Sequence, residues 1–172
     1  MIDKIKKVIP LLELGMLVGV ITFLLTLLTT TLWQFDGISM IELIMLPLVG
    51  GFYLFLSIIV VNIVGINKVR KLNIKSNMQP IKKFYQVLIV ISISILFYTL
   101  LDSIYFIFDN SLSTDYASSL ESVLSATGES TADFKDFEKL PFSIQNIFSS
   151  ISVAIISGLI SLPFIKVDGK IF

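Results

Sequence analysis

Four long stretches of the chain carry almost no charged side chains and are of similar length. They cover residues 10–33, 41–66, 84–108 and 142–165. A helix rises about 1.5 Å per residue, so about 20 apolar residues are needed to cross the roughly 30 Å hydrocarbon layer of a bilayer. Each stretch meets that length. The pattern predicts an all-α membrane protein, a four-helix bundle in which residues 1–172 form a single transmembrane domain.

The connection between the third and fourth stretches has a helical pattern of its own. Apolar side chains recur at helical spacing between the potential N-caps Ser113 and Thr114 and the break at Gly128. A second apolar run, 134–140, follows Ser130 and Thr131. We expect two short amphipathic helices on the outer membrane surface. Structural covering of the bundle and a docking surface for a partner are both open interpretations.

The basic residues are segregated along the chain, although the net charge is zero. Eleven of the thirteen Lys and Arg lie before the first stretch (4–7), between the second and third (68–83) or after the fourth (166–170). Segments rich in Lys and Arg stay in the cytoplasm. The long connection 109–141 carries seven acidic residues against two lysines. Both termini are therefore predicted to be cytoplasmic, and this connection to face outward.

The amino-acid composition limits which catalytic and metal-binding groups the chain can contain. The chain is 55% hydrophobic with a mean hydropathy of +0.90, and it contains no histidine and no cysteine. Cys nucleophiles, His general bases and the usual nitrogen and sulfur metal sites are excluded. We expect no catalytic, metal-binding or cofactor-binding residues. The basic segment 68–83 suits anionic lipid headgroups, and we expect no nucleic-acid partner.

Small residues at helical spacing mark the faces where helices can approach closely. Gly15 and Gly19 are four residues apart in the first stretch, and Ser150, Ala154 and Gly158 continue that spacing in the fourth. We expect these faces to contact other helices. They either close the four-helix bundle or form a dimer face.

Three polar residues within the stretches are the candidate buried polar groups: Glu13, Asn62 and Asp102. For Glu13, pairing with a nearby lysine competes with a functional role. Asn62 is predicted to form an interhelical hydrogen bond. Asp102 is either part of a stabilising polar cluster or part of an ion site. Its expected neighbours are Tyr98, Ser103, Tyr105, Gln145 and Asn146.

The whole arrangement resembles domain-of-unknown-function family 4199, which comprises small four-span bacterial membrane proteins. The resemblance rests on the basic segment 68–83, the aromatic and acidic exit Tyr105 to Asp109, the helix with Tyr116, the break at Gly128 and the final helix ending in a lysine. It implies a bacterial inner-membrane protein. The family offers no established activity and no functional residues to carry over.

These observations predict a non-enzymatic integral membrane protein, an accessory or scaffolding subunit that acts by helix association. Its expected partners are membrane lipids, together with other membrane protein subunits or further copies of itself. The alternative is a small transporter or channel that uses polar groups in the second and third spans. An intramembrane enzyme would need at least two acid or hydroxyl groups at one depth, whereas Glu13 and Asp102 are expected near opposite surfaces.

Overall fold

The computed structural model describes residues 2–33, 40–76, 81–126, 128 and 132–166. This part of the chain contains helices and no strand, which confirms the all-α prediction. The longer elements are α1 (Ile2–Trp33), α2 (Met40–Val60), α3 (Asn67–Lys75), α4 (Lys83–Phe108), α5 (Ser111–Ala126) and α7 (Ile147–Ser161). The shorter ones are the π-helical η1 (Val61–Ile66), the 3₁₀-helical η2 (Ala132–Lys139) and η3 (Leu162–Phe164), and α6 (Phe142–Gln145).

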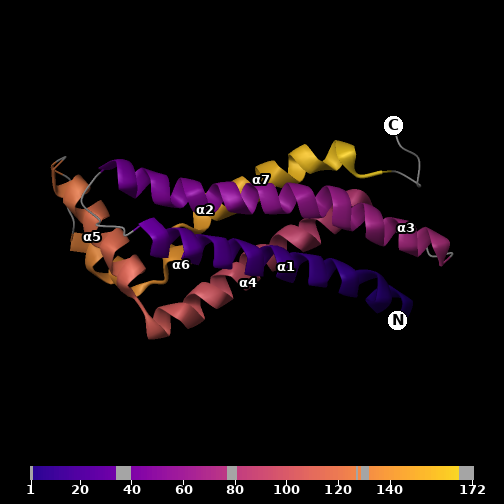
Figure 1. Cartoon of the computed structure of the whole chain (residues 1–172), viewed down its shortest axis with the longest axis horizontal. Helices are drawn as coiled ribbons and strands as arrows, with labels where there is room; N and C mark the ends of the chain where they lie inside the picture. The colour runs from indigo at the N-terminus through magenta and orange to yellow at the C-terminus, as the bar shows by residue number, and fades with distance from the viewer. Residues whose placement is uncertain (1, 34–39, 77–80, 127, 129–131, 167–172) are drawn as a thin grey trace.

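Four helical segments are long and apolar enough to cross a membrane, as judged by length and composition. They are Lys7–Leu32, Pro47–Lys75, Lys83–Phe108 and Ile147–Phe164. Figure 1 shows them as an elongated bundle that has α5 at one end and both the start of α1 and the end of η3 at the other. This is the architecture of an integral membrane protein.

The third stretch matches α4 closely, whereas the helices of the other three differ from the predicted boundaries. Helix α1 begins at Ile2, eight residues before the predicted start at Pro10. The second helix does not end at Ile66 but continues through η1 into α3, so half of the predicted basic loop is helical. The fourth stretch is interrupted at Asn146, whose φ of −111° and ψ of 20° separate α6 from α7. Hydropathy reports where a helix meets lipid, not where its hydrogen bonding stops.

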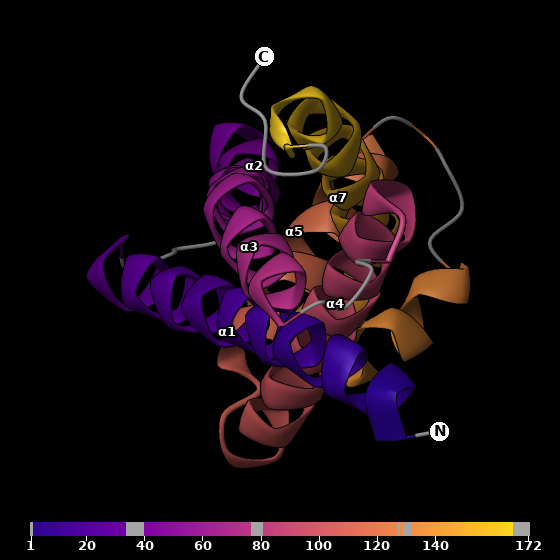
Figure 2. The ribbon, with the colours of Figure 1, turned by 90° about the vertical axis from the view of Figure 1, so that its right-hand side faces the viewer.

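The helices pack mainly in pairs, α1 along α4 and α2 along α7 (Figure 2). A cluster of fully or almost fully buried residues fills the middle of the bundle and contains Val18, Leu54, Ile58 and Ala154. A second apolar cluster lies nearer the basic end, where Leu11 and Ile66 meet Val87, Val90 and Ile165. Helices α4 and α7 contact each other much less than the two main pairs do.

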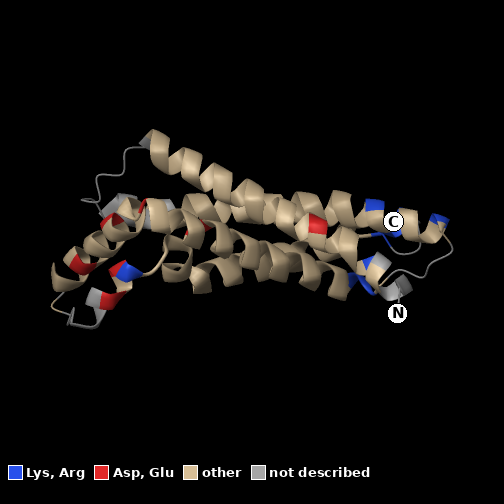
Figure 3. Ribbon diagram, turned by 90° about the horizontal axis from the view of Figure 1, so that it is seen from below, with Lys and Arg blue, Asp and Glu red and all other residues tan. Residues whose placement is uncertain are grey.

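Charge is distributed along the long axis of the bundle. Lys and Arg gather at the end where α1 begins, and most acidic residues lie at the end covered by α5 (Figure 3). At the acidic end, α5 and η2 pack their apolar residues against each other and against Phe142, whose ring meets Tyr116 edge to face at 5.2 Å. The two predicted amphipathic segments thus form a cover over the end of the bundle, although η2 is a 3₁₀ helix rather than an α-helix.

Candidate functional site

A buried acidic side chain, Asp102 of α4, forms a hydrogen bond to a distant part of the chain inside the bundle. Buried residues of α4 recur every three or four positions, and this spacing turns Asp102 inward on the same face as Ser94 and Tyr98. Its Oδ2 accepts a hydrogen bond of 2.8 Å from the backbone amide of Ser143, 41 residues away in the chain. Asp102 therefore caps the first turn of α6.

The start of α6 explains why a carboxylate is suited to this position. Pro141 is the N-cap residue, and its side chain offers no hydrogen bond to the first turn. The early amides of a helix have no partner inside the helix, and its N-terminus attracts negative charge. The Asp102 carboxylate supplies both an acceptor and the charge from a neighbouring helix.

Three further side chains join the cover to the bundle next to this cap. The Tyr116 hydroxyl donates to Asn146 Oδ1 at 3.0 Å, while Asn146 Nδ2 donates to the Phe142 carbonyl at 3.1 Å. The Gln145 amide donates to carbonyls in three segments, those of Ser113, Phe137 and Leu140, over 3.2, 3.1 and 2.8 Å. We call Asp102, Ser143, Gln145, Asn146 and Tyr116 the outer polar cluster.

A small cavity of about 10 Å³ adjoins the outer polar cluster. It is lined by Thr22, Tyr98 and Asn146, by serines of α7 including Ser150, and by apolar residues of α2. The buried Thr22 hydroxyl has no hydrogen-bond partner. A cavity of at least roughly 10–15 Å³ with several polar neighbours is needed for one water molecule. This cavity is at that lower limit and far too small for a larger ligand.

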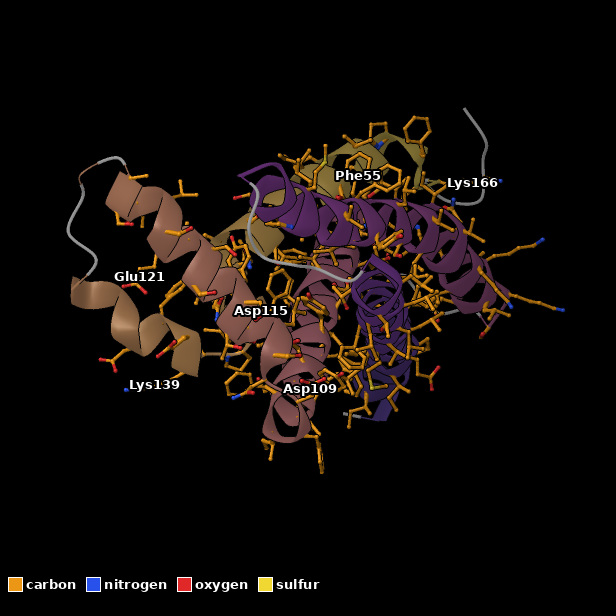
Figure 4. The ribbon with its side chains drawn as sticks, turned by 60° about the vertical axis from the view of Figure 1, so that its left-hand side comes forward. Phe55, Asp109, Asp115, Glu121, Lys139 and Lys166 are labelled. Carbon is orange, nitrogen blue, oxygen red and sulfur yellow. The ribbon has the colours of Figure 1, made fainter. Side chains whose placement is uncertain are left out.

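A shallow pocket of about 210 Å³ lies at the acidic end of the bundle between α1, the end of α4 and α5, and is lined by Asp109 and Asp115. Figure 4 shows both side chains, with Glu121 further along α5. Asp109 accepts hydrogen bonds from the Ser111 hydroxyl and amide, which hold its pKa below the usual range, and one from the Tyr105 hydroxyl at 2.9 Å. Partial burial, and then the charge of Asp109, raise the pKa of Asp115. Asp109, and not Ser113 or Thr114 as predicted, caps α5.

Two asparagines tie α7 and η3 to the second helix. Asn62 is fully buried in η1 and donates to the Ser161 hydroxyl at 3.0 Å. Asn67, at the start of α3, donates to the Phe164 carbonyl at 3.1 Å and accepts from the Lys166 amide at 2.7 Å. The Asn67 side chain thus provides the hydrogen-bond partners for the Phe164 carbonyl and the Lys166 amide, in the backbone that follows α7.

At the basic end, the buried Arg70 joins α3 to the beginning of α4. Its guanidinium donates to Gln86 Oε1 at 2.9 Å and to the Ile81 carbonyl at 3.0 Å. Gln86 is fully buried. The sequence places Arg70 only within the predicted cytoplasmic basic segment, whereas in the structure its side chain also joins α3 to Ile81 and Gln86 at the beginning of α4.

Glu13 differs from the expectation that it is a buried polar group, because its side chain is exposed on the surface of α1. It lies between Ile9 and Leu17, which are 46% and 49% exposed. The predicted pairing with a lysine is not found among the side chains that the structure describes, where the ion pair is that of Lys139 with Asp136. Spacing within a helix fixes neighbours along a stripe but not which stripe faces the bundle.

The small residues lie at contacts within the bundle. A Cβ on Gly15 would lie 2.6 Å from Ile93 Cβ, and one on Gly19 would lie 2.9 Å from the Ser94 carbonyl oxygen, so both glycines let α1 approach α4. A Cβ on Gly158 would overlap the side chain of Ile91. Ala154 is fully buried in the central apolar cluster, and Ser150 lines the small cavity.

Sequence reasoning missed several of these contacts. Ser103 and Tyr105 were expected beside Asp102, but their hydroxyls bond to the Thr99 carbonyl and to Asp109 instead. The partner of Asp102 is the backbone amide of Ser143, and a search for nearby polar side chains cannot identify a backbone amide. The only available signal was Pro141, which marks a helix start whose free amides need an acceptor.

A metal site and known relatives are the last two possible sources of a functional assignment. No group of three or more acidic, His or Cys side chains that could hold a metal occurs among the residues placed by the structure. Comparison with family models, curated proteins and solved structures finds no match to this chain.

Proposed function

We propose that this chain is a non-enzymatic accessory or scaffolding subunit that associates laterally with another membrane protein through the outer face of α1. The single observation that carries the proposal is the exposed Glu13. Glu13 lies six positions after Lys7, where the candidate span begins, and therefore about 9 Å further along the helix axis. Its neighbours on that stripe, Ile9 and Leu17, are exposed apolar residues.

A carboxylate facing hydrocarbon is unfavourable unless another group solvates it. A charged side chain at the bilayer centre costs at least about 2.5 kcal/mol, and the cost falls toward the interface, where Glu13 lies. A helix that places a cation or a hydrogen-bond donor against this stripe would remove much of that cost. Polar contacts between membrane helices contribute about 0.6 kcal/mol on average and up to about 1.7.

The small-residue faces do not supply an alternative association surface. Gly15 and Gly19 contact α4, and Gly158 contacts Ile91, so these close approaches are used within the chain. This favours the interpretation that they close the bundle over the dimer-face interpretation. We therefore propose that lateral association uses the exposed face of α1 that contains Ile9, Glu13 and Leu17.

A photocrosslinking experiment tests the proposal. A benzophenone amino acid at Leu17 should give a discrete protein adduct in native membranes, whereas the same group at Leu56, an exposed position on α2, should not. The adduct should disappear when Glu13→Leu is added, and mass spectrometry of the adduct distinguishes a different subunit from a second copy. Absence of an adduct at Leu17, or the same adduct at both positions, contradicts the proposal.

A small transporter or channel is the second candidate, and the buried amide and hydroxyl groups of the bundle favour it. Against it, Asn62 and Asp102 are each engaged in a hydrogen bond to a different part of the fourth span. Ala154 lies between those two bonding points along the span, within the buried apolar cluster. A path between Asn62 and Asp102 would require this cluster to open.

For location, we propose a bacterial inner membrane with both termini in the cytoplasm. The basic end of the bundle supports this orientation. The bacterial membrane is the expectation that the resemblance to family 4199 implies. Membrane lipids and one or more membrane proteins are the proposed partners, and no nucleic acid is among them. Glu13 and Asp102, the acidic residues of the candidate spans Lys7–Leu32 and Lys83–Phe108, do not converge on one site, which supports a non-enzymatic role.

A further inference from the structure

A lipid-facing apolar groove runs between α4 and α7. It has a volume of about 510 Å³, within the range of roughly 300–1,000 Å³ that single-ligand pockets have. Phe84, Leu88 and Ile95 line one side, and Ile151, Ile155 and Leu159 line the other. Gly158 lies in this groove, where the side chains of Ile91 and Val87 of α4 approach α7 closely.

The length of the groove corresponds to one half of a bilayer. From Phe84 to Ile95 along α4, the lining spans twelve residues, and the eleven steps between them give about 16 Å of helix rise. The lining on the other side extends over a similar length, from Ile151 to Leu162. Half of the hydrocarbon layer is about 15 Å thick. A groove of this length therefore accommodates one acyl chain from a single leaflet.

The basic end of the groove carries positive charge. Lys82 and Lys83 immediately precede Phe84. Lys166, which is labelled in Figure 4, follows the last turn after Leu162. None of these three lysines is in an ion pair with the residues that the structure describes. Lysines at this level of a membrane attract anionic headgroups, each with about 1 kcal/mol.

The lining favours a flexible chain over a protein helix. Tight packing of a membrane helix needs small residues that let two backbones approach. The rim of this groove is built from Ile, Leu and Phe, and its one glycine, Gly158, already contacts Ile91. Among the lining residues, Ser92 on α4 is the only one whose side chain carries a hydrogen-bonding group, and those on α7 have none.

We propose that this groove is a binding site for an anionic phospholipid of the leaflet at the basic end, with one acyl chain between α4 and α7 and the phosphate beside Lys82 and Lys83. The site is independent of the proposed role of Glu13. It would make an anionic lipid a structural ligand beside the contact between α4 and α7, which is smaller than those of α1 with α4 and of α2 with α7.

Native mass spectrometry of the detergent-purified chain tests this site. The protein is titrated with phosphatidylglycerol and with phosphatidylcholine of the same acyl chains. With about 1 kcal/mol from each of Lys82 and Lys83, the wild type should bind the first phosphatidylglycerol about thirtyfold more tightly than the first phosphatidylcholine. The double variant Lys82→Gln/Lys83→Gln should lose that preference, while the control Lys71→Gln/Lys75→Gln, at exposed lysines of α3, should keep it. Ile155→Trp should weaken binding of both lipids, whereas Leu56→Trp, at an exposed position on α2, should not.

Three results would overturn the proposal. The first is equal binding of the two lipids to the wild type, and the second is equal loss in the groove variants and their controls. The third is a dimer of the wild type that excludes lipid and dissociates in the Ile155→Trp variant, because the groove would then hold a second copy. If the Trp variant does not fold, as judged by its thermal unfolding, the two lysine double variants decide the question alone.

Discussion

The cap formed by Asp102 on α6 leads to a quantitative prediction. In the Asp102→Leu variant, the Ser143 amide would lose the acceptor that now lies 2.8 Å away. Leaving a buried donor unsatisfied costs roughly 1–3 kcal/mol. In a chain of this length, each kcal/mol shifts the melting temperature by about 2–4 °C. For the mid-range cost of about 2 kcal/mol, the Leu variant should therefore melt about 4–8 °C below the wild type.

The Asp102→Asn variant separates the hydrogen bond from the charge. Its amide oxygen can still accept from Ser143, so its free energy of unfolding should stay within about 1 kcal/mol of the wild type. Ser103→Ala is a matched control on the same helix, because the Ser103 hydroxyl bonds only to its own helix at the Thr99 carbonyl. The assay is thermal unfolding in one detergent, combined with hydrogen exchange at the Ser143 amide, which should become faster only in the Leu variant.

Two outcomes would refute this reasoning. A Leu variant that melts with the wild type would show that the Ser143 amide finds another partner and that the cap adds no stability. An Asn variant that folds normally yet fails like a deletion, in cells where the deletion impairs growth, would show that the charge of Asp102 is required. Transport or proton coupling would then replace the structural account, because an amide cannot take up or release that charge.

Three further predictions follow from the packing and the charge distribution. Cysteines placed at the exposed positions Ser76 and Ser125 should react with a membrane-impermeant reagent from opposite sides, and labelling from one side would contradict the four-span topology. Gly158→Leu should lower the melting temperature more than Leu159→Phe, because only the first introduces atoms where Ile91 already lies, and equal melting temperatures would count against that contact. Asn67→Ala should expose the chain after α7 to added protease while leaving the bundle intact, and unchanged cleavage would show that its two hydrogen bonds do not hold that segment.

The membrane architecture could be predicted from the sequence because it follows from quantities that are local in the chain. A run such as 84–108 is long enough to cross a bilayer whatever its neighbours are, and α4 occupies Lys83–Phe108. The acidic connection likewise contains its own helical period, and α5 forms there. In each case the solvent or the spacing decides the outcome, and no distant contact is needed.

The site could be predicted only in part because its contacts join distant segments. The hydrogen bond between Asp102 and Ser143 spans 41 residues, and that between Asn62 and Ser161 spans 99. Whether these residues face each other depends on how each helix is rotated about its own axis. Composition does not specify that rotation, which is also why Glu13 could be named only as a candidate buried polar group and is found exposed on the surface of α1.

The distribution of these contacts indicates how the bundle can carry two separate interactions. Interhelical hydrogen bonds lie toward the ends, at Asp102 near the cover and at Arg70 near the basic end, while the middle is closed by apolar packing. The two proposed external contacts use different elements, because α1 carries Glu13 but contributes no lining residue to the groove between α4 and α7. Replacing Glu13 by Leu should therefore abolish the crosslink from α1 and leave the preference for phosphatidylglycerol unchanged. A change in lipid preference in that variant would mean that the two faces are coupled through α4, which packs against α1 along most of its length.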